Sequence, residues 1–220
     1  DADAGVDATP TVATPAGDAA ADIVGRLARS SARPPDLSTA GEEEARSLFQ
    51  GDSGSFMVNW PYVYGAAKEG VETGAIDQSV LDDIAWARYP RVDRDRPSAP
   101  PLGGINLAIG NFTEHPDEAL AAVKCITSVP ANAQYMVESG NPAARAAAYD
   151  DPEVREAFPM ADLIRDSLAD AGPRPITPYY GDVSTSVQRT WHPSNQVESP
   201  STPERTDTYM SEVLQGERLL

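Results

Sequence analysis

Short apolar runs that end at proline or open with glycine alternate along this chain with longer segments of helical periodicity. Residues 55–60, 84–89 and 103–109 each have the length and apolar content of a buried strand. Between these runs, apolar side chains recur at three- and four-residue intervals, which is the spacing of an amphipathic helix. The alternation predicts the α/β class with helix predominating, and it argues against a β-sandwich or a helical bundle.

Proline, glycine and acidic residues predict where the helices begin and end. We expect helices to begin near residues 23, 42, 64, 116, 130, 152, 161, 183 and 203. Those near 116 and 152 open with proline and first-turn acids, and Gly140 ends the one near 130. Residues 1–22 show little apolar periodicity, which predicts a loop or an orphaned edge segment.

The charge balance and the rare residues exclude several classes of function. A net charge of −17 argues against nucleic acid and against an anionic membrane surface, because both attract clustered Lys and Arg. Cys125 is the only cysteine, so no disulfide can form within the chain, and we expect its thiol to be buried. His115 and His192 lack the spacing of metal ligands. We therefore expect no metal site and no cofactor.

Three short motifs occur in a fixed order among these elements. They are Asn59-Trp60-Pro61-Tyr62, Gly103-Gly104-Ile105-Asn106 and Arg174-Pro175-Ile176-Thr177-Pro178-Tyr179-Tyr180. Together they resemble the extracellular solute-binding proteins of bacterial ABC sugar importers, family 1, of the maltose and trehalose type. Residues 149–220 are similar to actinobacterial members, including the mycobacterial trehalose-binding lipoproteins.

The resemblance implies a two-lobed fold of the type II periplasmic-binding-protein kind, whose α/β lobes close on a ligand by a hinge motion. This chain would be its C-terminal half. Residues 1–22 would be a loop or orphaned edge segment, and 23–92 part of the C-terminal lobe. Residues 93–142 would be the hinge crossover and the segment returning to the N-terminal lobe, and 143–220 the remainder of the C-terminal lobe.

The resemblance also implies a function and its partners. The chain would be the receptor of an ABC sugar transporter and would bind a disaccharide or oligosaccharide, such as trehalose or another α-glucoside. Its partners would be the sugar, the membrane permease subunits and the missing N-terminal half of the same protein. It would lie outside the cell, anchored through a lipidated N-terminus that this chain does not contain. No bond would be made or broken.

The aromatic residues of the first motif suit a sugar site. A sugar presents an apolar C–H face edged by hydroxyls, so its receptor needs an aromatic plate and fixed polar groups. Trp60, at the end of a predicted strand, suits the plate, and Tyr62 could share that surface. The simpler interpretation is that both rings pack in the core.

The second and third motifs supply backbone and side-chain polar groups. Gly103 and Gly104 would let a ligand approach the backbone, although the sequence alone favours a turn or bulge as their explanation. Related sugar binders place an aromatic residue after these glycines, whereas this chain has Ile105, which leaves the identity of the sugar open. Arg174 would donate directed hydrogen bonds to hydroxyls, with Arg189 as its competitor. Tyr180, more than Tyr179, would face the cleft.

Two other classes of function compete with the receptor interpretation. A carbohydrate-active hydrolase would need two carboxylates facing each other across a cleft, and no motif nominates such a pair. The other is an unrelated secreted interaction domain. Turnover of a chromogenic glycoside would favour the hydrolase, and reversible sugar binding without turnover the receptor.

Overall fold

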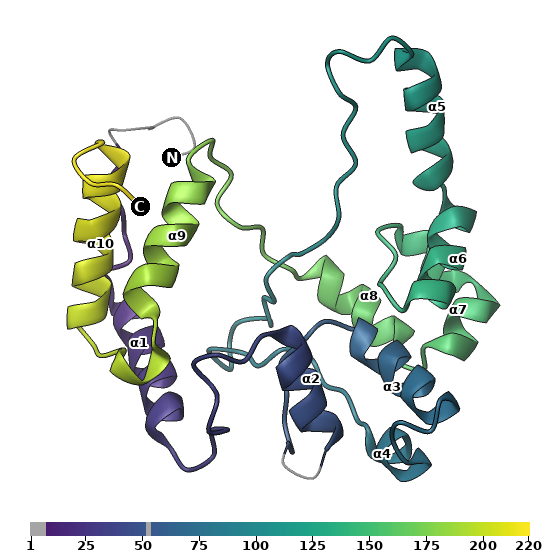
Figure 1. Ribbon diagram of the computed structural model, residues 1–220, viewed down its shortest axis with the longest axis horizontal. Helices are drawn as coiled ribbons and strands as arrows, with labels where there is room; N and C mark the ends of the chain where they lie inside the picture. Colours follow the sequence, from purple (N-terminus) through teal and green to yellow (C-terminus); the bar gives the residue numbers. More distant parts are fainter. Residues whose placement is uncertain (1–7, 52–53) are drawn as a thin grey trace. The chain divides into compact units, whose positions relative to one another are not determined.

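The computed structural model describes residues 8–51 and 54–220. The chain forms two compact units, the first built from Asp1–Gly41 and Pro175–Leu220 and the second from Glu42–Arg174. Helices predominate in both units, as predicted (Figure 1). The boundaries of these two compact units differ from the expected lobe boundaries. The assignment of segments to lobes stays a prediction.

The first unit contains three long helices and a short 3₁₀ helix: α1 (Pro15–Arg29), α9 (Tyr180–Trp191), η3 (Ser194–Gln196) and α10 (Ser201–Leu214). Helices α9 and α10 lie side by side (Figure 1). Their interface is hydroxyl-rich, because Thr190 and Thr206 are buried and their hydroxyl oxygens lie 2.9 Å apart. Trp191 Nε1 also donates to the Thr206 hydroxyl at 3.0 Å.

Helix α1 begins earlier than expected, so the prediction of a loop through residue 22 is wrong for residues 15–22. Thr14 caps the helix by accepting from Gly17 N at 3.3 Å, and Pro15 occupies the first turn. The buried face of α1 consists of small residues, Ala21, Gly25 and Ala28, which a search for large apolar residues overlooks. Residues 1–7 of the expected loop lie outside the described residues.

The second unit contains α2 (Glu42–Gln50), α3 (Tyr62–Glu72), α4 (Gln78–Asp83), α5 (Pro116–Ile126), α6 (Val129–Ser139), η2 (Ala146–Asp150), α7 (Pro152–Ala157) and α8 (Ala161–Ala169). Its core is formed by α6, η2, α7 and α8 around Met136, Tyr149 and Phe158. Tyr64 of α3 packs against this core, and its ring also meets Trp86 edge-on at 5.6 Å.

Local capping chemistry explains several helix ends in the second unit. Gly140 ends α6 in the left-handed conformation with φ of 76°, which glycine adopts without steric cost. The Asp151 side chain accepts from Glu153 N at 2.9 Å at the start of α7. Both ends were predicted from the sequence.

The three predicted strands lie outside the helices, but the described residues pair into no ladder. The one β-bridge among them is parallel and joins Pro101 to Gly172. It is closed by hydrogen bonds from Leu102 N to Gly172 O at 2.8 Å and from Gly172 N to Pro100 O at 2.9 Å. An extended segment becomes a strand only when a neighbour satisfies its backbone groups, and residues 55–60, 84–89 and 103–109 have no such neighbour in the described chain.

Helix α5 departs from the expected burial. The sequence predicted an apolar face there and a buried Cys125, but α5 has no buried residue and Cys125 is exposed. The expectation for Cys125 is therefore wrong, because α6 is the chief neighbour of α5 and does not cover this face. None of the helices in the described chain has both the length and the apolar character needed to cross a bilayer.

Candidate functional site

Trp60 lies in the segment that leads into α3. The residue is 38% exposed, so it is neither fully buried nor fully exposed. Indole Nε1 donates to Glu42 Oε1 at 2.8 Å, and its backbone N–H donates to Asn59 Oδ1 at 2.7 Å. Asn59 Nδ2 in turn donates to the Glu42 carbonyl at 3.1 Å. The first turn of α2 thus holds the ring and its backbone.

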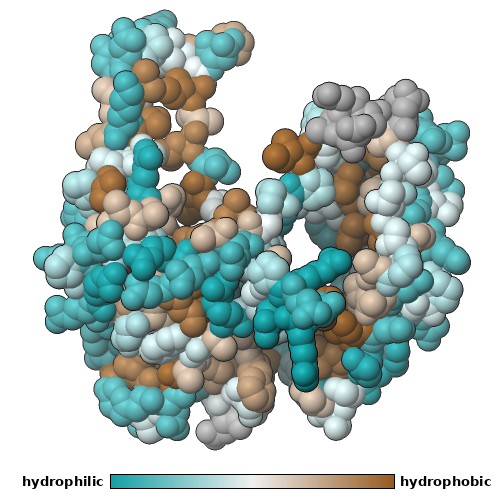
Figure 2. Space-filling model, turned by 180° about the vertical axis from the view of Figure 1, so that it is seen from behind, coloured by the Kyte–Doolittle hydropathy of each residue, from teal (hydrophilic) through white to brown (hydrophobic). Residues whose placement is uncertain are grey.

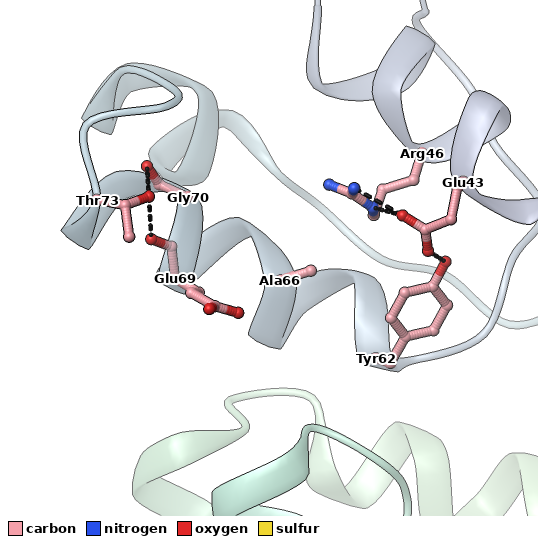
Figure 3. A pocket seen from close by; sticks show the side chains of 7 residues that line it. All are labelled: Glu43, Arg46, Tyr62, Ala66, Glu69, Gly70 and Thr73. Carbon is pink, nitrogen blue, oxygen red and sulfur yellow. Dashed lines mark hydrogen bonds and ion pairs between the residues drawn. The ribbon is translucent and has the colours of Figure 1, made fainter.

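Tyr62, in the first turn of α3, is held by the neighbouring carboxylate. Its hydroxyl donates to Glu43 Oε1 at 2.6 Å, and Glu43 Oε2 accepts from Nε and NH2 of Arg46 at 2.8 and 2.7 Å. Arg46 NH1 also donates to Gln50 Oε1 at 2.6 Å. Figure 3 shows the Tyr62 ring pointing toward Glu43, which lies between the phenol and the guanidinium.

This chain of contacts shifts two pKa values in opposite directions. The hydrogen bond from Tyr62, followed by that from Arg46, lowers the pKa of Glu43. Burial of the phenol, followed by its hydrogen bond to the Glu43 carboxylate, raises the pKa of Tyr62 to about 12. Glu43 is therefore ionised and Tyr62 is neutral over the physiological range.

A pocket of about 320 Å³ adjoins this group. It is lined by Glu43, Arg46, Tyr62, Ala66, Glu69, Gly70 and Thr73, and its two ends are formed by α2 and by the end of α3 (Figure 3). The lining offers carboxylate oxygens, a guanidinium and a hydroxyl, which are the donors and acceptors that a polyol needs.

Gly103 lies against the six-membered ring of Trp60. A Cβ added at Gly103 would lie 2.5 Å from Cη2 and 2.7 Å from Cζ3 of the indole, so only glycine fits without movement of the ring. At Gly104 an added Cβ would meet no atom within 4 Å. Of the two glycines, Gly103 thus has a packing role, and Gly104 faces open space.

The backbone places Arg174 in the same neighbourhood. The parallel bridge joins Pro101 to Gly172. Gly103 lies two residues after Pro101, and Arg174 lies two residues after Gly172. At about 3.3 Å per extended residue, both lie within roughly 7 Å of that bridge. Arg174 is exposed and makes no hydrogen bond or ion pair with the described residues.

The remaining candidates belong to the first unit. Tyr180 opens α9, is partly buried, and donates its backbone N–H to Thr177 O at 3.2 Å. Arg189, the competitor of Arg174, is exposed near the end of the same helix. The structure therefore brings together Trp60, Tyr62 and Gly103, with Arg174 close to the bridge beside them, whereas Tyr180 is placed in a separate unit.

Two residues of this group were missed by the reasoning from sequence. Glu42 and Glu43 were assigned only to a short helix, yet each anchors one aromatic side chain of the candidate site. A signal was present, because the first turn of α2 carries successive acids, and carboxylates are favoured at a helix N-terminus. Which side chains the two carboxylates contact depends on the loop that brings Trp60 and Tyr62 back to α2.

Neither histidine contributes to this group. His192 Nε2 lies 2.7 Å from the Ser38 carbonyl oxygen, and His115 precedes α5. In the part of the chain that the structure describes, no three His, Cys, Asp or Glu side chains cluster in a way that could hold a metal ion.

Comparison with a solved structure identifies the fold. Maltose-bound MalE3 of T. maritima matches 96% of this chain with a TM-score of 0.74 and 26% sequence identity. The chain has the type II periplasmic-binding-protein fold. The match covers 52% of the MalE3 chain, so this chain corresponds to about half of that structure.

A curated relative supports the same grouping. This chain is 33% identical over 147 residues to a probable ABC transporter-binding protein of Deinococcus radiodurans. The aligned part is 66% of this chain and 33% of the relative, so the chain spans about a third of that protein's length. No protein-family model matches the sequence. Both similar proteins are binding proteins and not enzymes.

Proposed function

We propose that this chain is part of the substrate-binding receptor of an ABC sugar importer. The observation that carries the proposal is its likeness, over nearly its whole length, to a maltose-bound binding protein, combined with relatedness to a transporter-binding protein. The ligand that we propose is a disaccharide or oligosaccharide, such as trehalose or another α-glucoside.

The candidate site supports a sugar in chemical terms. Trp60 offers an anchored, partly exposed indole on which the C–H face of a pyranose can stack. The carboxylate of Glu43, the Tyr62 hydroxyl and Arg46 line one pocket and can exchange hydrogen bonds with sugar hydroxyls. Gly103, Gly104 and Arg174 complete the proposed site in the second unit, and Tyr180 stays a separate candidate in the first.

The proposed partners follow from the same likeness. They are the sugar, the permease subunits at the membrane, and a further N-terminal half that supplies the rest of the cleft. The proposed location is outside the cell, with membrane attachment through a lipidated N-terminus. In this proposal residues 93–142 carry the hinge crossover and return to the N-terminal lobe.

The receptor proposal is preferred over hydrolysis for a chemical reason. Glu43 is already committed to Tyr62 and Arg46, and its lowered pKa makes it a poor proton donor near neutral pH. A glycosidase acid needs a raised pKa instead. A chromogenic α-glucoside separates the two functions, since the receptor releases no chromophore.

The test is calorimetric titration of the longer gene product, which contains this chain, with trehalose, maltose and sucrose. Trp60→Ala and Arg174→Ala are compared with wild type, and Val92→Ala is the matched surface control because Val92 is exposed and lies outside the site. We expect saturable binding to one of the sugars, weakened at least tenfold in both site variants and unchanged in the control.

The alternatives have distinct outcomes. Binding that is insensitive to both site variants would move the cleft elsewhere in the fold. Failure to bind any of the three sugars would overturn the proposed ligand while leaving the fold intact. Because the proposed cleft needs a further N-terminal half, we expect the isolated chain to bind sugar weakly or not at all. Tight binding by the isolated chain would contradict the half-site proposal.

A further inference from the structure

A second pocket, of about 360 Å³, lies where residues 88–98 meet the end of α8. It is lined by Arg88, Tyr89, Arg91, Ser98 and Asp170, together with two prolines. Figure 2 shows exposed hydrophobic side chains of the second unit along α5. The lining of this pocket is instead mainly charged and polar, which suits a charged ligand.

The stretch that carries the pocket is locally positive. Residues 88–96 contain four arginines and two aspartates, in a chain whose net charge is −17. Charges farther away than about 8 Å are largely screened at physiological ionic strength, so the side chains that line the pocket outweigh the distant acids. Arg88 and Arg91 face one carboxylate there, that of Asp170, and the lining therefore favours an anion.

Arg88 has donors that the chain does not satisfy. Its NH2 donates to Asp170 Oδ2, and this is the one hydrogen bond that the structure shows for its side chain. Arg88 Nε is shielded from solvent and has no acceptor among the described residues. A buried donor without an acceptor is unfavourable, and a guanidinium matches the paired oxygens of a carboxylate or phosphate.

The loop that carries Arg91 is closed by its own hydrogen bonds. The buried Ser98 hydroxyl donates to the Tyr89 carbonyl at 2.6 Å and so joins the two ends of the loop. Arg91 NH1 donates to the Arg94 carbonyl at 3.2 Å, and Arg91 forms no ion pair with a carboxylate in the described chain. A loop that is already ordered loses less entropy when a ligand binds.

We propose that this pocket is a second binding site, for a small oxyanion that carries a carboxylate or phosphate group. Arg91 and the unpaired N–H groups of Arg88 donate to the oxygens of the anion, as charge-assisted hydrogen bonds. Asp170 leaves one net positive charge among the three side chains. A neutral sugar cannot match that charge, so the pocket differs in ligand class from the proposed sugar site.

The two sites are also separate along the chain. Ser98 and Asp170 precede the two partners of the parallel bridge, whereas Gly103 and Arg174 follow them. Because the bridge is parallel, both segments run from the pocket through the bridge toward the proposed sugar site. The anion and the sugar therefore occupy different residues and need not compete.

The test is calorimetric titration of the longer gene product, without sugar, with inorganic phosphate and with succinate at physiological ionic strength. We expect saturable binding of at least one probe, and the tighter probe identifies the group that the pocket takes. Arg91→Gln should weaken binding roughly tenfold, because it removes a charge-assisted donor. Asp170→Asn should strengthen it about twofold or more, because the amide still accepts from Arg88 but carries no charge.

Arg96→Gln is the matched control, because it removes the same charge from the same loop at an exposed residue that does not line the pocket. It should change the affinity by less than about twofold. Circular dichroism verifies that each variant folds. The proposal is overturned if neither probe binds, if Arg91→Gln binds as tightly as wild type, or if Arg96→Gln weakens binding as much as Arg91→Gln. No sugar enters the measurement, so its outcome is independent of the proposed sugar receptor.

Discussion

The indole Nε1 of Trp60 and Oε1 of Glu42 form a hydrogen bond of 2.8 Å, and the next residue, Glu43, accepts from the Tyr62 hydroxyl at 2.6 Å. Two successive carboxylates at the start of α2 thus orient two aromatic side chains that precede and open α3. An aromatic side chain that is already held in place loses less conformational entropy when a sugar binds than a mobile side chain does. This gives Glu42 and Glu43 a positioning role in the proposed site.

The bond between Glu42 and Trp60 should be measurable as a coupling energy. In a double-mutant cycle of Glu42→Ala and Trp60→Phe, we expect a coupling of about 0.5–1 kcal/mol, which is modest because the pair is partly exposed. Chemical denaturation of the four proteins measures it. Glu118→Ala, in the first turn of α5, should show no coupling to Trp60→Phe. A coupling near zero for Glu42 would mean that packing alone orients the ring.

Substitution of Gly103 should displace the indole. In Gly103→Ala the new methyl group would lie 2.5 Å from Cη2 of Trp60, so the ring must move and its bond to Glu42 must lengthen. We expect a changed near-ultraviolet circular dichroism spectrum and a shifted tryptophan emission. Gly110→Ala is the control, because a Cβ there meets no atom within 4 Å. Identical spectra for both variants would contradict the close approach.

Tyr62→Phe should raise the pKa of Glu43, because the phenol hydrogen bond is the chief cause of its lowering. The folded-state pKa lies below the unfolded value of about 4.3, so the contact stabilises the fold above that pH. This contribution is lost as the pH falls through the folded-state pKa. Carboxyl NMR titration of both proteins measures the shift. An unchanged Glu43 titration in Tyr62→Phe would assign the shift to Arg46 instead.

The phenol of Tyr62 should ionise at a higher pH than an ordinary tyrosine. Burial and the Glu43 carboxylate raise its pKa to about 12, above the ordinary value of about 10. The associated stabilisation is complete below about pH 10 and is lost as the pH rises through about 12. Absorbance titration at alkaline pH should show a late component that Tyr62→Phe diminishes. Tyr89→Phe, at an exposed tyrosine, is the control and should leave that component in place.

Tyr149→Phe should destabilise the second unit. Tyr149 is fully buried, and its hydroxyl donates to the Ala143 carbonyl at 2.9 Å. Removal of the donor leaves a buried carbonyl unsatisfied, which costs about 1–3 kcal/mol. Tyr135→Phe is the control, since Tyr135 is half-exposed and should change the free energy of unfolding by less than about 0.5 kcal/mol. Equal effects in thermal or chemical unfolding would contradict the assignment.

The sequence predicted those features whose cause is local. The capping of α7 by Asp151 and the end of α6 at Gly140 depend on residues within one turn, and both are confirmed. Helix α1 was placed too late because its buried face is made of small residues, Ala21, Gly25 and Ala28. Cys125 was expected in a core that the described chain does not build around α5.

By itself, the sequence determined most of the helices and the residue types suited to a sugar. Tertiary structure decided that Gly103 lies against Trp60, that Glu42 and Glu43 hold the two aromatic side chains, and that the predicted strands have no partners in the described chain. The reason is physical: a helix satisfies its backbone groups within its own segment, whereas a strand or a site needs groups from distant parts of the fold.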